Sequence, residues 1–166
     1  PTVLPEFSEI LKLFIDNGQR GIRVHSSGIL YNEVIKEGIE KQIVTLIVSV
    51  DSGCKEIYKK IKNVDKSDKV WANIKKYRNG LDDKQANFIK LKYIIVPNVN
   101  DTIEEVRNFL NKVKENDIKN IIVDIESTYV YSNSQGVEPY IFYLIDYMEN
   151  FAKNHEISVG PGRGSA

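Results

Sequence analysis

The 166-residue sequence has few of the side chains that bind soft metals. It contains one cysteine, Cys54, and two histidines, His25 and His155. A single cysteine excludes an internal disulfide, and these three side chains are too few for a zinc or iron–sulfur site held by this chain alone. We therefore expect no metal ion or cluster bound by its own residues.

Net charge and long hydrophobic runs are also missing. Lysine plus arginine total 23 and aspartate plus glutamate total 23, so no overall field favours nucleic acid or an anionic membrane as a partner. The longest apolar run, residues 43–50, is much shorter than the roughly 20 residues of a membrane helix. No signal peptide pattern is visible, so a reducing cytoplasm is the expected location.

The sequence does contain an alternation of helical and strand patterns. The near-continuous apolar run at 43–50 is typical of a strand covered on both faces of a parallel sheet. Further strands are predicted at 21–26, 89–96, 118–125 and 156–159, and helices at 5–17, 30–41, 54–62, 66–78, 102–116 and 137–154. Asp101 is the expected N-cap of helix 102–116. This pattern predicts one α/β domain over residues 1–159, an open sheet or part of a barrel, and a flexible tail over 160–166.

Small polar or acidic residues come after each main strand, at 26–28, 51–53, 97–101 and 124–126. In parallel α/β folds the ligand binds beyond the carboxyl ends of the strands. Short polar side chains at that edge favour a ligand with hydroxyl and amino groups, and Gly28 and Gly53 would permit close backbone approach. The same residue types cap helices and form turns, so a purely structural interpretation stays open.

Other candidate residues are less informative. His25 has no nucleophile partner in the sequence and favours a structural role, and Cys54 at a helix start is best interpreted as a packed thiol. Tyr129, Tyr131 and Tyr140 either line a substrate opening or cover the end of the barrel. The glycine-rich segment 160–165 lacks the ending of a phosphate-binding loop.

Several segments resemble radical S-adenosylmethionine enzymes. Residues 44–53 (VTLIVSVDSG), 58–62 (YKKIK) and 69–77 (KVWANIKKY) are similar to the middle of that family. Residues 91–101 (LKYIIVPNVND) resemble its later strand, which usually ends in Pro-Gly-x-Asn-Asp, and residues 24–28 (VHSSG) stand where a strand commonly ends in Thr-Asn-Gly. The resemblance covers roughly residues 1–150. It implies a partial (β/α)6 TIM-like barrel with parallel strands and about four βα units.

The resemblance also implies a function. A parent enzyme would bind S-adenosylmethionine and generate a 5′-deoxyadenosyl radical that abstracts hydrogen from a small-molecule or peptide substrate that the sequence does not identify. Residues 1–5 (PTVLP) are similar to the segment directly after Gly-Gly-Glu in a motif of the family. On that basis the chain lacks two strands and the three-cysteine loop of the [4Fe–4S] cluster, so we expect the cluster in the parent protein only and no activity from this chain alone.

The resemblance assigns roles residue by residue. The methionine end of S-adenosylmethionine would lie near Ser26 and Ser27, and the ribose hydroxyls near Ser49 and Asp51. The remaining assignments are backbone contacts to adenine from Val96, Asn98, Val99 and Asn100, and a substrate side formed by Asp124 and Glu126. Asn98 stands where the family usually has glycine, and asparagine tolerates the positive φ that such a turn needs. Asp51 is expected to be an isolated carboxylate whose removal changes stability little.

The missing strands also predict self-association. Without those strands, the strand at 21–26 would present an unpaired edge, and exposed edges promote self-association.

Two other functions remain possible. The alternative function is a non-radical α/β module of flavodoxin-like or phosphate-barrel type that binds a nucleotide or sugar. A structural or partner-docking domain is a third possibility.

Overall fold

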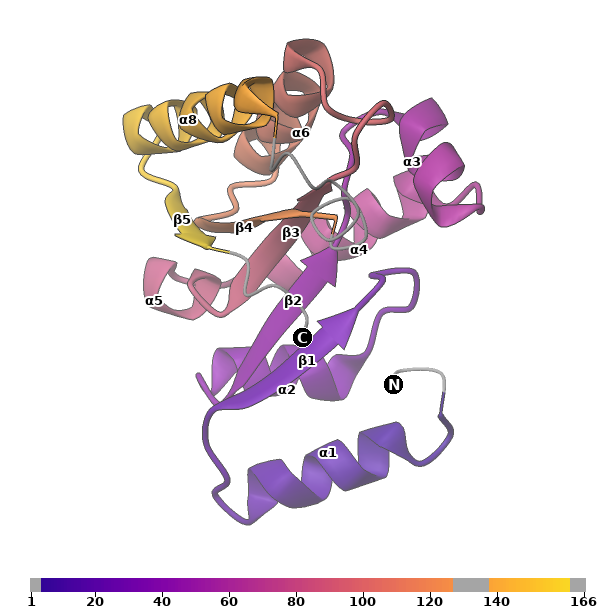
Figure 1. The fold of residues 1–166 in the computed structure, drawn as a ribbon. Coiled ribbons are helices and arrows are strands. Elements are labelled where there is room, and N and C mark those ends of the chain that lie inside the picture. Colours follow the sequence, from indigo (N-terminus) through magenta and orange to yellow (C-terminus); the bar gives the residue numbers. More distant parts are fainter. Residues whose placement is uncertain (1–3, 127–137, 162–166) are drawn as a thin grey trace.

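The computed structural model describes residues 4–126 and 138–161 and shows a five-stranded parallel sheet. The strands lie in the sheet in the same order as in the sequence (Figure 1). Their bounds are β1 Ile22–Ser26, β2 Val44–Ser49, β3 Ile89–Ile95, β4 Asn120–Ile125 and β5 Ser158–Pro161. All four pairings are parallel, as the alternating pattern predicts.

Helices connect the strands at the predicted places. Their bounds are α1 Phe7–Asp16, α2 Glu33–Glu40, α3 Lys55–Lys62, α4 Ser67–Arg78, α5 Asp83–Ala86, α6 Ile103–Glu115 and α8 Pro139–Asn154. The expected cap of α6 is wrong. Thr102 is the N-cap and its hydroxyl accepts from Glu105 N–H, whereas the Asp101 carboxylate accepts from Asn98 N–H and the Tyr140 hydroxyl.

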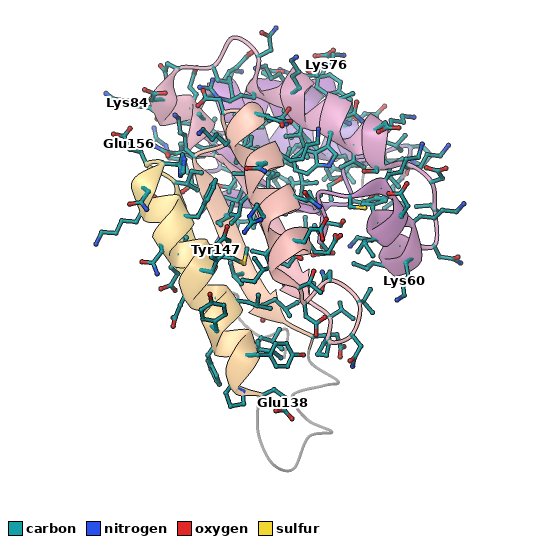
Figure 2. All side chains as sticks on the ribbon, turned by 90° about the horizontal axis from the view of Figure 1, so that it is seen from above. Lys60, Lys76, Lys84, Glu138, Tyr147 and Glu156 are labelled. Carbon is teal, nitrogen blue, oxygen red and sulfur yellow. The ribbon has the colours of Figure 1, made fainter. Side chains whose placement is uncertain are left out.

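The described helices leave one face of the sheet uncovered. In Figure 1, α2 and α4 pass behind the strands, and Figure 2 shows α6 and α8 side by side, with Tyr147 of α8 accepting a hydrogen bond from Arg107 of α6. The strand residues that face the helices form the apolar core, including Val24, Leu46 and Leu91. The helices and strands of the described residues leave the other face open, and its polar side chains are exposed or half-buried.

This open face differs from the expectation that β2 is covered on both sides. Thr45 and Ser49 of β2 point to the open face and are half-buried, and only Ile47 between them is buried there. Residues 43–50 are therefore apolar for two reasons. One face of β2 packs against helices, and on the other face the neighbouring strands bury Ile47.

The fold class is confirmed as α/β with parallel strands. Four strand–helix units are followed by a fifth strand, as in part of a (β/α)6 barrel. The consecutive strand order excludes the flavodoxin-like alternative, because that fold places its strands in the order 2-1-3-4-5.

One predicted boundary, between the domain and the tail, differs in the structure. Gly160 and Pro161 belong to β5, paired with Ile122 and Val123, so the expected tail over 160–166 begins too early by two residues. Residues 162–166, and Tyr129 and Tyr131, lie outside the described residues. No helix in the described ranges is both long and apolar enough to cross a membrane.

Candidate functional site

Asp51 lies just past β2 and joins three parts of the carboxyl edge of the sheet. Its side chain is buried, and its backbone takes a positive φ of 60°. Oδ1 accepts from Ile94 N–H at 2.8 Å, and Oδ2 accepts from Ser49 Oγ–H at 2.9 Å and from the ammonium group of Lys62. The expectation of an isolated carboxylate is therefore wrong. The side chain holds the ends of β2, β3 and α3 together.

Asn100 organises the loop after β3 in the same way. It is fully buried, and its Nδ2 donates to the carbonyl oxygens of Asp51 at 2.7 Å and Ile94 at 2.9 Å. Its Oδ1 accepts from Val96 N–H at 2.7 Å, and its carbonyl oxygen accepts from the Tyr93 hydroxyl at 2.6 Å. Both polar atoms of the Asn100 side chain therefore already have hydrogen-bond partners within the protein. These bonds fix the shape of the loop beside the β2 end.

Asn98 occupies the turn of that loop with a φ of 63°, as expected for a position where the family usually has glycine. Its N–H donates to Asp101 Oδ2 at 2.8 Å, and its side chain is exposed. Val99 beside it is half-buried. The Asn98–Val99 step is therefore the part of the loop that faces outward.

The loop after β1 carries the serines assigned to the methionine end. Ser26 is half-buried and its Oγ accepts from Gly28 N–H at 3.1 Å, while Ser27 is exposed. Asn73 of α4 donates to the carbonyl oxygens of Gly28 at 2.9 Å and Ile29 at 3.0 Å. Helix α4 therefore anchors this loop from behind, a role that the sequence did not reveal for Asn73.

Tyr77 supports the next part of the same loop. Its hydroxyl accepts from Asn32 N–H at 2.8 Å, at the start of α2. Burial raises the pKa of Tyr77 to about 12. The 69–77 segment thus stabilises the loop through both Asn73 and Tyr77.

The two glycines at this edge are required by protein packing. A Cβ on Gly53 would lie 2.2 Å from the carbonyl carbon of Asn108 in α6, and a Cβ on Gly28 would lie 2.8 Å from Val48. Gly28 also has a φ of 76°. The close approach that the sequence suggested for a ligand is in both cases an approach of the chain to itself.

The residues assigned to the substrate side lie at the end of β4. Asp124 forms an ion pair with Lys92 of β3 at 2.9 Å, and both side chains are largely buried. Glu126 is half-buried, and its N–H donates to the Ile95 carbonyl at 2.9 Å. Asp124 thus lies beside Lys92, a β3 residue on the open face of the sheet.

The sequence analysis did not predict the two lysines that pair with carboxylates at this edge. Lys62 balances Asp51, and Lys92 balances Asp124. The alternation of lysine with apolar residues at 89–92 is the one available signal for Lys92, because it places Lys90 and Lys92 on the face opposite the core. Nothing in the sequence pairs Lys62 with Asp51, which lies 11 residues earlier.

The single thiol is not activated. Burial, and the Glu56 carboxylate that accepts from Cys54 Sγ–H at 3.0 Å, raise the pKa of Cys54. In the described residues no three His, Cys, Asp or Glu side chains are grouped to hold a metal ion. Because the sequence has one cysteine, these residues do not fit the thiolate set of a [4Fe–4S] cluster.

His25 is placed differently from the expected structural role. It is exposed on the open face of β1 and makes no hydrogen bond within residues 4–126 and 138–161. It lines a cleft together with side chains of β2, β3 and β4.

Comparison with known proteins supports the fold. No family model matches the sequence, and no curated protein matches it. Streptococcus suis SuiB in complex with S-adenosylmethionine has a TM-score of 0.67 and 12% identity, with 95% of this chain and 34% of SuiB covered. A domain of the pyruvate-formate lyase-activating enzyme from Bacteroides vulgatus has the same score, 14% identity, and 95% and 91% coverage.

A radical SAM methyltransferase from Sphaerobacter thermophilus is also similar, with a TM-score of 0.54, 14% identity, and coverage of 88% of this chain and 42% of that one. This chain therefore spans about a third of the length of SuiB and nearly all of the Bacteroides domain. At these identities the likeness concerns the fold. By structure, the chain is an α/β fold of five parallel strands that resembles part of a radical S-adenosylmethionine barrel.

Proposed function

We propose that this chain is the S-adenosylmethionine-binding part of a radical SAM-type barrel, with the cosubstrate at the carboxyl ends of β1, β2 and β3. The observation that carries the proposal is the match of nearly the whole chain to SuiB bound to S-adenosylmethionine. The polar residues of this chain gather at the edge where parallel α/β folds bind their ligands.

The geometry refines the role of each assigned residue. Ser26 and Ser27 keep their place at the methionine end, because one is half-buried and the other exposed. Ser49 is the ribose contact in the refined proposal. Its hydroxyl donates to Asp51 and accepts from Lys62 at 3.3 Å, which leaves one lone pair to accept from a ribose hydroxyl. Asp51 becomes a positioning residue, since it is 1% exposed and both of its oxygens already accept hydrogen bonds.

Fewer residues remain as proposed contacts to adenine. The N–H groups of all four residues already donate within the loop, so exposure decides among them. Asn98 is exposed, whereas Asn100 is fully buried. We therefore assign the adenine side to the outward Asn98–Val99 step, with Asn100 as the residue that shapes it. Asp124 and Glu126 remain the proposed substrate side.

The chemistry assigned to this chain ends at binding and positioning. Its residues do not fit an iron–sulfur cluster, so no reductive step is derived from them. The whole parent reaction and its substrate are thus outside the proposal.

Isothermal titration of the chain with S-adenosylmethionine tests the proposal. We expect saturable 1:1 binding, and Ser49→Ala should raise Kd about fivefold, the equivalent of one hydrogen bond of about 1 kcal/mol. Ser158→Ala is the matched control, since Ser158 is exposed at the amino end of β5. Equal Kd values for both variants, or no binding at all, would favour a phosphate-barrel or docking role instead.

A further inference from the structure

The open face of the sheet holds a cleft of about 450 Å³ whose lining includes none of the residues assigned to S-adenosylmethionine. Its lining includes two side chains of β1, Arg23 and His25, and two lysines of β3, Lys90 and Lys92. The rest of the lining consists of Thr45, Ile47, Ile122 and Gly160. A volume of this size is in the range of small-molecule sites.

The register explains how the cations converge. His25 is paired with Ile47, and Ile47 with Lys90, so these three residues form one row across β1, β2 and β3. Arg23 is paired with Thr45, one pleat closer to the amino ends. Strands are about 4.8 Å apart, which places the β1 and β3 side chains roughly 10 Å apart on either side of Ile47.

One of the cations in the cleft is balanced by a carboxylate, and two have no such partner among the described residues. Lys92 forms an ion pair with Asp124, but neither Arg23 nor Lys90 has a carboxylate partner within the described residues. Lys90 is half-buried, so its charge is partly removed from water. Arg23 is exposed, and an anion bound between the two side chains would interact with both positive charges.

We propose that this cleft binds a small dianionic oxyanion, a phosphoryl group or a pair of carboxylates on a small organic molecule. The Arg23 guanidinium provides a planar fork for two oxygens, and Lys90 provides a second positive charge from the opposite side. Thr45 offers a hydroxyl, and Ile47 and Ile122 offer an apolar surface for the rest of the ligand. The site lies nearer the amino ends of the strands than the proposed S-adenosylmethionine site and does not depend on it.

Titration with inorganic phosphate and with malonate, at a fixed ionic strength of about 0.1 M, tests this site. We expect saturable 1:1 binding of at least one of the two in the millimolar range. The double variant Arg23→Ala/Lys90→Ala should weaken binding roughly tenfold or more, because it removes two charge-assisted contacts. Stronger binding of one probe identifies the phosphoryl or the dicarboxylate form of the ligand.

The matched control is Lys59→Ala/Lys60→Ala, which removes the same number of charges from the exposed face of α3. Figure 2 shows Lys60 at the periphery of the molecule. This control should leave Kd within about twofold, because charges beyond a Debye length are largely screened. Equal weakening in both double variants, or the absence of saturable binding of either probe, would overturn the proposal.

Amide chemical shifts of the unmodified chain provide a second readout that needs no variant. Phosphate or malonate should move the amide signals of Arg23, Thr45 and Lys90 along one saturating curve. Shifts confined to helix surfaces would contradict the site even if both double variants fail to fold.

Discussion

Asp51 connects the end of β2 to segments that lie far along the sequence. Its carboxylate accepts from Ile94 N–H, 43 residues away, and its backbone carbonyl accepts from the Asn100 side chain, 49 residues away. The position of Asp51 after an apolar strand indicated a residue at the carboxyl edge. Its partners were not predictable, because they depend on the register between β2 and β3, which a single sequence does not specify.

Replacing Asp51 by alanine should therefore destabilise the fold, contrary to the expectation for an isolated carboxylate. Breaking a buried ion pair costs about 3–5 kcal/mol, and we expect about 3 kcal/mol because Lys62 is 23% exposed and can turn toward water. Urea denaturation measures this change.

Asp65→Ala is the control for that experiment. Asp65 pairs with Lys55, and both side chains are about half exposed, so its removal should cost about 0.5 kcal/mol. A loss of similar size in both variants would show that Asp51 is not a structural link.

At the scale of elements, the end strand β1 has a free edge. Ile22 N–H donates to the Ile43 carbonyl, and alternate residues of a parallel ladder face the same neighbour. The N–H groups of Arg23 and His25 therefore face away from β2. No other strand in residues 4–126 and 138–161 pairs with this edge. Helix α1, at the same end of the sheet (Figure 1), also exposes Ile10, Leu13 and Phe14.

These features support the expectation that the chain self-associates through β1. His25→Pro should shift the chain toward monomer, because proline removes the outward N–H of an edge strand without disturbing the bonds to β2. His25→Ala is the control, since it removes the same side chain and keeps the N–H. Sedimentation at high micromolar concentration compares them. Monomeric wild-type protein, or dissociation in both variants alike, would contradict pairing through this edge.

Most elements were predictable because their periodicity is local. The strands and helices lie within a few residues of their predicted bounds. The caps were harder, since Asp101 and Thr102 are both good N-cap residues and the structure uses Thr102. The choice depends on Asp101 being engaged with Asn98 and with Tyr140, a residue 39 positions away.

At the scale of the whole molecule, buried tyrosines couple stability to alkaline pH. Burial raises the pKa of Tyr77 to about 12, and it also raises the pKa of Tyr58 and Tyr93. Because the folded state holds these protons more tightly than the unfolded state, the tyrosines contribute fully to the free energy of unfolding below pH 10. This contribution is lost as the pH rises from 10 through 12.

We therefore expect the chain to unfold cooperatively in that interval, with Tyr77 alone contributing a loss of up to about 3 kcal/mol. Absorbance at 295 nm and far-UV circular dichroism, recorded on the same samples, should change together for the buried tyrosines. Ionisation of all nine tyrosines near pH 10 with the fold intact would contradict this prediction.

All of the proposed residue roles depend on the binding of S-adenosylmethionine at the carboxyl edge of the sheet. Titration of the ¹⁵N-labelled chain with this molecule tests it most directly, because the amide signals report where the ligand binds. We expect saturating shifts for Ser26, Ser49 and Asn98, and unchanged signals at the amino edge for Gly21, Lys41 and Asn87. Shifts at the amino edge, or none up to millimolar S-adenosylmethionine, would contradict the proposal.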